Sequence, residues 1–202
     1  MTLRSRWWLP AAVLVLTMIQ LAVGAFADLP QFEGKGFGAR LWAYPLMMML
    51  VPAIWFAWRS RGTSEASRGA RAAGREGIPW LAFALVMLGF LVDVTGNTLD
   101  LYDSVVWWDD ANHFVNWIFL NAGLGLLLVP SVEKRWARVL LVTGLGAILA
   151  IGWELGEWYT FIRHGTELDT AYQDTLGDEA LGTLGAFVAG LLVINHRRRP
   201  TS

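Results

Sequence analysis

The sequence predicts an all-α fold, a polytopic membrane helical bundle of about six transmembrane helices. Of its 202 residues, 55% are hydrophobic and only 16% are charged, and the mean hydropathy is +0.43. Several apolar runs also approach the roughly 20 residues that a helix needs to cross a bilayer. We expect a single integral-membrane domain, 1–202, with spans at about 8–27, 37–58, 78–100, 113–130, 139–159 and 179–195.

The first run, within "RSRWWLP…VGAFAD", has basic residues before it and an A-x-A-like end, as a signal peptide does. Its apolar stretch is longer than the usual hydrophobic region of such peptides. We therefore expect a retained first helix.

Charge is distributed unevenly along the chain. Thirteen of the sixteen Lys and Arg residues fall in the N-terminus, the loop 59–77, the loop after the fourth run and the C-terminal tail. Basic residues accumulate in cytoplasmic loops. The pattern predicts cytoplasmic termini and an acidic face on the periplasmic or extracellular side of a bacterial inner (plasma) membrane.

The loop 59–77 is rich in Arg, Gly, Ala and Ser and has no apolar periodicity. It is typical of a flexible basic linker beside anionic headgroups. Because no aromatic residues are interleaved with its charges, we expect no nucleic-acid partner; the expected partner is the lipid bilayer.

The chain contains no cysteine. Disulfides, thiolate metal sites and iron–sulfur clusters are thereby excluded. No P-loop, Rossmann or G-x-S-x-G motif is present. We expect no nucleotide, haem or iron–sulfur cofactor.

Polar residues recur at helical spacing toward the acidic-side ends of three apolar runs. Such spacing places side chains on one helix face. In the third run the spacing is i, i+4, i+7; in the fourth an acid stands beside a histidine with an asparagine at i+3; in the fifth two acids are i, i+3. These residues are Asp93, Asn97 and Asp100 in the third run, Asp109 or Asp110 with His113 and Asn116 in the fourth, and Glu154 with Glu157 in the fifth.

An ionised acid at membrane depth costs about 2.5–3.5 kcal/mol, so such groups usually have partners. Arg163 and His164 are the only basic residues near these acids in this part of the sequence, and the acids outnumber them. The excess predicts a proton, a cationic ligand or a divalent metal, whose identity this donor set leaves open.

Two residues are candidates for catalysis, Glu154 as a general base and His113 as a proton shuttle. With a metal-activated water they would suit hydrolysis of an envelope lipid or lipid-linked substrate. Alternatively, acids before the last run cap that helix. A di-iron site is disfavoured, because only one usable histidine is visible. The candidate metal ligands are Asp110, His113, Glu154, Glu157, Asp174 and Asp178.

Small residues repeat at four-residue spacing in the last two runs. Such faces let membrane helices approach closely. The pattern predicts that the last three helices pack as one compact unit around the acids. The residues are Gly152 and Gly156, and Gly182, Ala186 and Gly190.

The segments "DDANHF", "GWELGEW" and "DTLGDEALGTLGAFVAG" resemble VanZ-like bacterial membrane proteins, and more closely the YjdF-type inner-membrane proteins of unknown function. The resemblance covers roughly 93–195 and implies a common fold and polar site rather than a reaction. Gly182 stands where VanZ-like proteins usually have Asn, which favours the YjdF-like branch. The matching positions are Asp110, His113, Glu154, Glu157, Asp174, Asp178, Gly182 and Gly185.

Two non-catalytic functions compete with hydrolysis. Asp93 and Glu154, with few counter-charges, would suit a proton relay in a small transporter. No inverted repeat and no pair of Pro/Gly-broken helices supports transport. The other alternative is an accessory or structural subunit, in a homo-oligomer or with a partner membrane subunit, whose acids satisfy one another or the partner chain.

Overall fold

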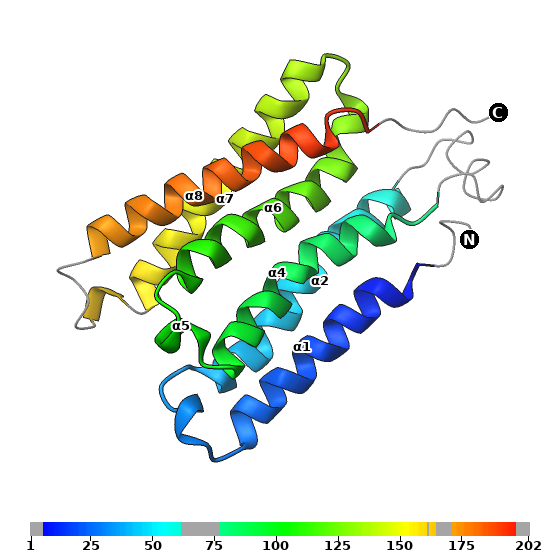
Figure 1. The fold of residues 1–202 in the computed structure, drawn as a ribbon. Coiled ribbons are helices and arrows are strands. Elements are labelled where there is room, and N and C mark those ends of the chain that lie inside the picture. The colour runs from blue at the N-terminus through cyan, green and yellow to red at the C-terminus, as the bar shows by residue number, and fades with distance from the viewer. Residues whose placement is uncertain (1–5, 62–76, 161, 165–170, 197–202) are drawn as a thin grey trace.

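The computed structural model describes residues 6–61, 77–160, 162–164 and 171–196. Within these residues the regular elements are helices (Figure 1). The α-helices are α1 (Trp8–Phe26), α2 (Phe37–Arg61), α4 (Trp80–Thr98), α5 (Leu101–Ser104), α6 (Trp108–Leu128), α7 (Arg135–Thr160) and α8 (Ala171–Val193). Single 3₁₀ turns cover Pro30–Phe32, Val129–Ser131 and Ile162–His164.

Six of these helices, all but the short α5, are long and apolar enough to cross a membrane. The predicted all-α membrane bundle is confirmed. Part of the expected basic loop 59–77 is helical, because α2 continues to Arg61. Residues 62–76 of that loop lie outside the described residues.

Three helices begin earlier than hydropathy predicted, and one of them is α7, which starts at Arg135 rather than 139. The fourth span starts at Trp108 rather than 113, and the last at Ala171 rather than 179. Their first turns carry acids, which stabilise a helix N-terminus but lower the local hydropathy. Asp178 lies in the third turn of α8, so its interpretation as a helix cap is wrong, whereas Asp174 lies in the first turn.

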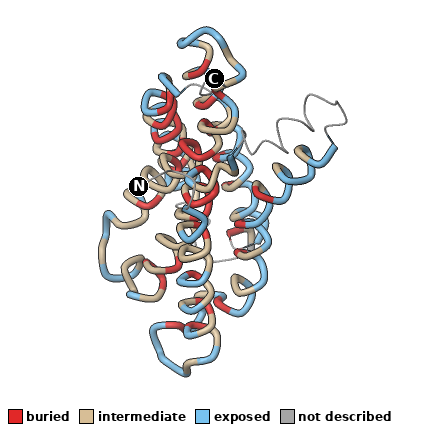
Figure 2. Tube along the Cα trace, turned by 90° about the vertical axis from the view of Figure 1, so that its right-hand side faces the viewer, coloured by how far each residue is buried: buried red, intermediate tan, exposed pale blue. Residues whose placement is uncertain are grey.

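The helices form two groups of three, α1–α2–α4 and α6–α7–α8, and α4 packs against α6 between them (Figure 1). The first group encloses a core around Leu21, Met48 and Val94, and the second a core around Val142 and Ala189. Buried and exposed positions alternate along the helices (Figure 2), and many of the exposed residues are large and apolar. Such an outer surface suits lipid.

Close helix contacts in the second group depend on glycine. A Cβ at Gly185 would lie 2.5 Å from the Phe114 carbonyl oxygen, and one at Gly182 would lie 2.9 Å from the Trp117 ring. The small-residue face predicted for the last helix is confirmed. The corresponding prediction for α7 is wrong within the described chain, because a Cβ at Gly152 or Gly156 would meet nothing within 4 Å.

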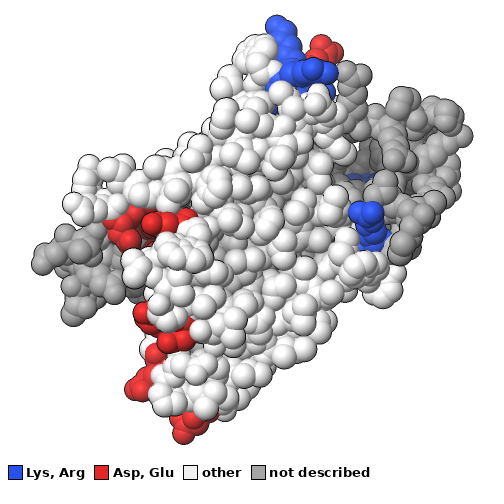
Figure 3. All heavy atoms as spheres, viewed as in Figure 1, with Lys and Arg blue, Asp and Glu red and all other residues white. Residues whose placement is uncertain are grey.

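The two ends of the bundle differ in charge. Acidic side chains gather at the end where α7 ends and α8 begins, and basic ones gather at the opposite end (Figure 3). The polar residues discussed below all lie toward the acidic end.

Candidate functional site

Asp93 on α4 is the centre of a hydrogen-bond network. Its Oδ2 accepts from Arg40 Nη1 at 3.1 Å and from the Tyr44 hydroxyl, both on α2. Its Oδ1 accepts from the Tyr102 hydroxyl at 2.7 Å and from Asn97 Nδ2 at 3.3 Å. The expectation that Asp93 has few counter-charges is therefore wrong, because Arg40 neutralises it from 53 residues away.

The network continues into α6. The Tyr102 hydroxyl also accepts a hydrogen bond from Asn112 Nδ2, and Asn112 Oδ1 accepts one from Asn116 Nδ2 at 2.7 Å. Burial and the nearby charge of Asp93 raise the pKa of Tyr102 far above its usual range, which keeps the hydroxyl protonated as a donor. Asn112 directly precedes His113, so the network holds the segment that carries the histidine.

Asp100 does not continue the stripe of Asp93 and Asn97, because α4 ends at Thr98. Asp100 has a left-handed backbone, φ 60°, and its carboxylate pairs with Lys35. Asp103 also pairs with Lys35, at 2.7 Å. Burial lowers the pKa of Lys35, but the hydrogen bonds and charges of the two aspartates outweigh it and raise that pKa. The Lys35 hydrogen bond lowers the pKa of Asp103.

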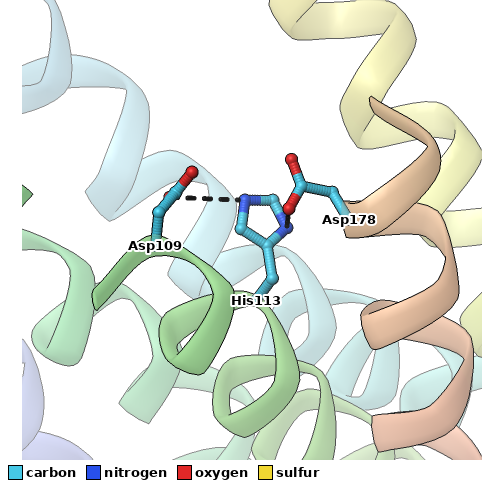
Figure 4. A group of neighbouring side chains, drawn as sticks. All are labelled: Asp109, His113 and Asp178. Carbon is cyan, nitrogen blue, oxygen red and sulfur yellow. Dashed lines mark ion pairs between the residues drawn. The ribbon is translucent and has the colours of Figure 1, made fainter. Parts of the chain in front are cut away.

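A second polar group surrounds His113 on α6 (Figure 4). The imidazole lies between two aspartates: Nε2 is 3.7 Å from Asp109 Oδ1, and Nδ1 is 3.5 Å from Asp178 Oδ1 on α8. The His113 side chain is only 10% exposed, and that of Asp178 only 5%. Nδ1 of His113 is buried and makes no hydrogen bond within the described chain.

Glu154 and Glu157 approach the same histidine from α7. One ligand atom from each of these three residues lies within 4.8 Å of the others, as is also true of Asp109, His113 and Asp178. The E-x-x-E spacing thus places both glutamates on the face that meets α6. We call Asp109, His113, Glu154, Glu157 and Asp178 the His113 cluster.

Within the part of the chain that the structure describes, the acids of the His113 cluster outnumber the basic groups beside them. Among the residues that the structure describes, no Lys or Arg forms an ion pair with any of its four carboxylates. The acids near α4 differ, since Arg40 pairs with Asp93 and Lys35 pairs with Asp100. The three helices of the cluster are candidate membrane spans, where unpaired acids are costly.

Besides the residues near α4 and Asn116, four predicted site residues lie apart from the cluster. Asp110 and Asp174 are exposed and belong to neither three-residue group. Asp109 takes the place expected for Asp110, because a four-residue spacing to His113 keeps it on the same helix face. Arg163 lies over the Tyr159 ring, 3.6 Å from its centre. His164 belongs to the turn Ile162–His164, and its side chain is outside the described residues.

Beside the cluster, a hollow of about 240 Å³ lies between α7 and α8. Glu154 belongs both to this hollow and to the His113 cluster. The hollow is lined by Ile151, Glu154, Leu155 and Trp158 of α7 and by Thr175 and Glu179 of α8.

One turn deeper than His113 on α6, the Trp117 ring packs against Gly182.

Fold and site together define a polytopic helical membrane protein with a polar cluster near one end. The chain belongs to the family DUF2238, described as a predicted membrane protein, whose model matches residues 70–199. The match includes the whole His113 cluster but not Arg40, Tyr44 or Lys35. Neither a curated protein nor a solved structure matches the chain.

Proposed function

We propose that the His113 cluster binds a divalent cation, and that the protein uses this cation to hydrolyse an envelope lipid or a lipid-linked substrate. One observation carries the proposal: four carboxylates surround a buried imidazole, and no Lys or Arg of the described chain pairs with them. A cation would supply the missing charge. Nδ1 of His113 can serve as a ligand atom, and it is costly for a buried nitrogen to lack a hydrogen-bond or metal partner.

The geometry suggests a division of roles within the cluster. Asp109, His113 and Asp178 offer two carboxylates and one imidazole, a set that suits Mg²⁺, Mn²⁺, Fe²⁺ or Zn²⁺. A cation held there would acidify a bound water. Glu154 remains within reach of His113 and also lines the hollow. It is therefore suited to accept the proton from that water as general base.

The charge distribution supports an outward-facing site. Basic residues cluster at the end of the bundle opposite the His113 cluster (Figure 3), and basic ends of membrane proteins are cytoplasmic. On this basis the cluster faces the periplasmic or extracellular side of a bacterial inner membrane. The segments that resemble YjdF-type and VanZ-like proteins contain the cluster, which supports assigning the chain to that group.

Two observations favour hydrolysis over the non-catalytic alternatives. A proton relay needs polar groups that continue across the bundle, but four residues beyond His113 on α6 the Trp117 ring packs against Gly182. A structural subunit has no need of a hollow that reaches one of its acids, as this one reaches Glu154.

Metal content of the detergent-purified protein tests the cation. We expect a near-stoichiometric divalent metal in the wild type, measured by plasma mass spectrometry after dialysis, and its loss in His113→Ala and Asp109→Asn. Asp110→Asn is the matched control, since Asp110 is an exposed neighbour outside the cluster. A folded wild type that takes up no metal, or equal loss in Asp109→Asn and Asp110→Asn, would contradict the proposed site.

A further inference from the structure

The hollow between α7 and α8 combines two kinds of surface. Its wall on α7 is formed largely by Ile151, Leu155 and Trp158, which are exposed on a membrane-spanning helix. The medium around that helix is lipid, so a hydrocarbon chain is the neighbour that these side chains meet. The hollow is therefore open to lipid along its apolar side.

The polar part of the hollow is acidic. Glu154 and Glu179 contribute carboxylates and Thr175 contributes a hydroxyl. Glu179 is only partly buried, and no Lys or Arg within the described residues pairs with it. Two carboxylates repel a headgroup of net negative charge and attract a cation that can donate hydrogen bonds.

The depth of the two carboxylates in the membrane indicates that the cation belongs to a lipid headgroup. Glu179 follows the start of α8 by eight residues and Glu154 precedes the end of α7 by six, which places them about 12 Å and 9 Å from those helix ends at 1.5 Å per residue. The headgroup region of a bilayer leaflet is roughly 5–8 Å thick. Both carboxylates are thus close to the boundary between headgroups and hydrocarbon, where the polar end of a lipid can reach them.

We propose that the hollow binds a membrane lipid with a primary ammonium headgroup, its hydrocarbon chain lying along Ile151, Leu155 and Trp158 and its ammonium pairing with Glu179. This inference deepens the proposed function, on which it rests, because it names the substrate class and its route of entry. The lipid enters sideways from the bilayer between α7 and α8. Its polar end then lies beside Glu154, the residue that the hollow shares with the His113 cluster.

Lipid retention tests the headgroup. The protein is reconstituted with equal parts of phosphatidylethanolamine, phosphatidylcholine and phosphatidylglycerol, and retained lipids are counted by native mass spectrometry. We expect phosphatidylethanolamine, whose ammonium donates hydrogen bonds, to exceed phosphatidylcholine, whose trimethylammonium has no N–H, by about fivefold, the size of one net hydrogen bond. Glu179→Gln should abolish the excess. Glu133→Gln, an exposed acid outside the hollow, should preserve it.

A photoreactive acyl chain on the same lipid tests the tail. We expect cross-links to peptides containing Ile151, Leu155 or Trp158. Ile151→Trp should fill the hollow and remove most of them. Ile148→Trp is the matched control, because Ile148 is an exposed isoleucine of α7 one turn earlier that does not line the hollow.

Three results would overturn the inference: equal retention of the three lipids, a preference for phosphatidylglycerol, or an enrichment that survives both Glu179→Gln and Ile151→Trp. Neither residue is a proposed cation ligand, so metal content measured on the same samples separates the two proposals. A wild type that retains its metal but shows no lipid enrichment refutes the lipid site alone. Enrichment without metal refutes the cation site alone.

Discussion

Asp93→Asn is expected to destabilise the bundle strongly, although Asp93 lies outside the His113 cluster. The substitution removes the charge that faces Arg40 and replaces one acceptor oxygen with an amide that cannot accept from Tyr44 or Tyr102. Breaking a buried ion pair by removing one partner costs about 3–5 kcal/mol. Because the Arg40 and Asp93 side chains are 24% and 19% exposed, we expect about 2–3 kcal/mol.

For a chain of this length, that cost corresponds to a fall in Tm of roughly 5–10 °C. Thermal unfolding in detergent, followed by intrinsic fluorescence, measures it. The double variant Arg40→Gln/Asp93→Asn should lose less stability than the sum of the losses in the two single variants, because each single variant leaves the other residue unpaired. Additive effects, or a Tm change below about 2 °C, would refute the assignment of Asp93 as a structural hub. Loss of bound metal in folded Asp93→Asn protein would instead make Asp93 part of the cation site.

Three further predictions concern other contacts. The stabilisation that Lys35→Met removes should be constant between about pH 5 and 9. The pKa of Asp103 is lowered, so its contribution is lost only as pH falls below the ordinary value of 3.8; the pKa of Lys35 is raised, so its contribution is lost only as pH rises above the ordinary value of 10.5. A loss near pH 7 in the stability difference between wild type and mutant would count against this pairing. Gly185→Ala should lower the free energy of unfolding by about 1–3 kcal/mol, because its Cβ would meet a backbone carbonyl of α6 at 2.5 Å. Gly152→Ala, in open space, should be neutral or stabilising by up to about 1 kcal/mol. Equal effects of the two variants on chemical unfolding would disprove the packing. Arg138→Ala should lower the Tm, because Arg138 donates to three backbone carbonyls, two of them beyond the end of α8; an unchanged Tm would show that water satisfies these carbonyls equally well.

The six spans could be predicted from hydropathy because a membrane helix must be long and apolar, and each of these is. The largest errors are at the N-terminal ends of α6 and α8, where acids lower hydropathy without ending the helix. Which glycines pack was harder to predict. Four-residue spacing occurs on both α7 and α8, but it does not reveal which face of a helix meets a neighbour, and Gly152 faces open space while Gly182 meets Trp117.

Within the candidate site, the sequence predicted pairs on one helix better than partners on different helices. The spacing of Glu154 and Glu157 was sufficient to place them together. A four-residue count back from His113 could also have selected Asp109 over Asp110. By contrast, the Arg40 partner of Asp93 lies 53 residues away and on another helix, and no local pattern marks it.

The two polar systems occupy neighbouring faces of α6, and this arrangement explains how a cluster of acids with no Lys or Arg partner among the described residues is tolerated. Asn112 and His113 are consecutive, so they point about 100° apart around the helix; Asn112 bonds to Tyr102, and His113 lies against Asp178. The side of α6 that carries Asn112 is held through Tyr102 to the Asp93 carboxylate, which Arg40 neutralises, and these bonds fix the rotation of the helix. The side of α6 that carries His113 can then hold acids that no Lys or Arg of the described residues pairs with, at a cost in stability that a bound cation would offset by mass action.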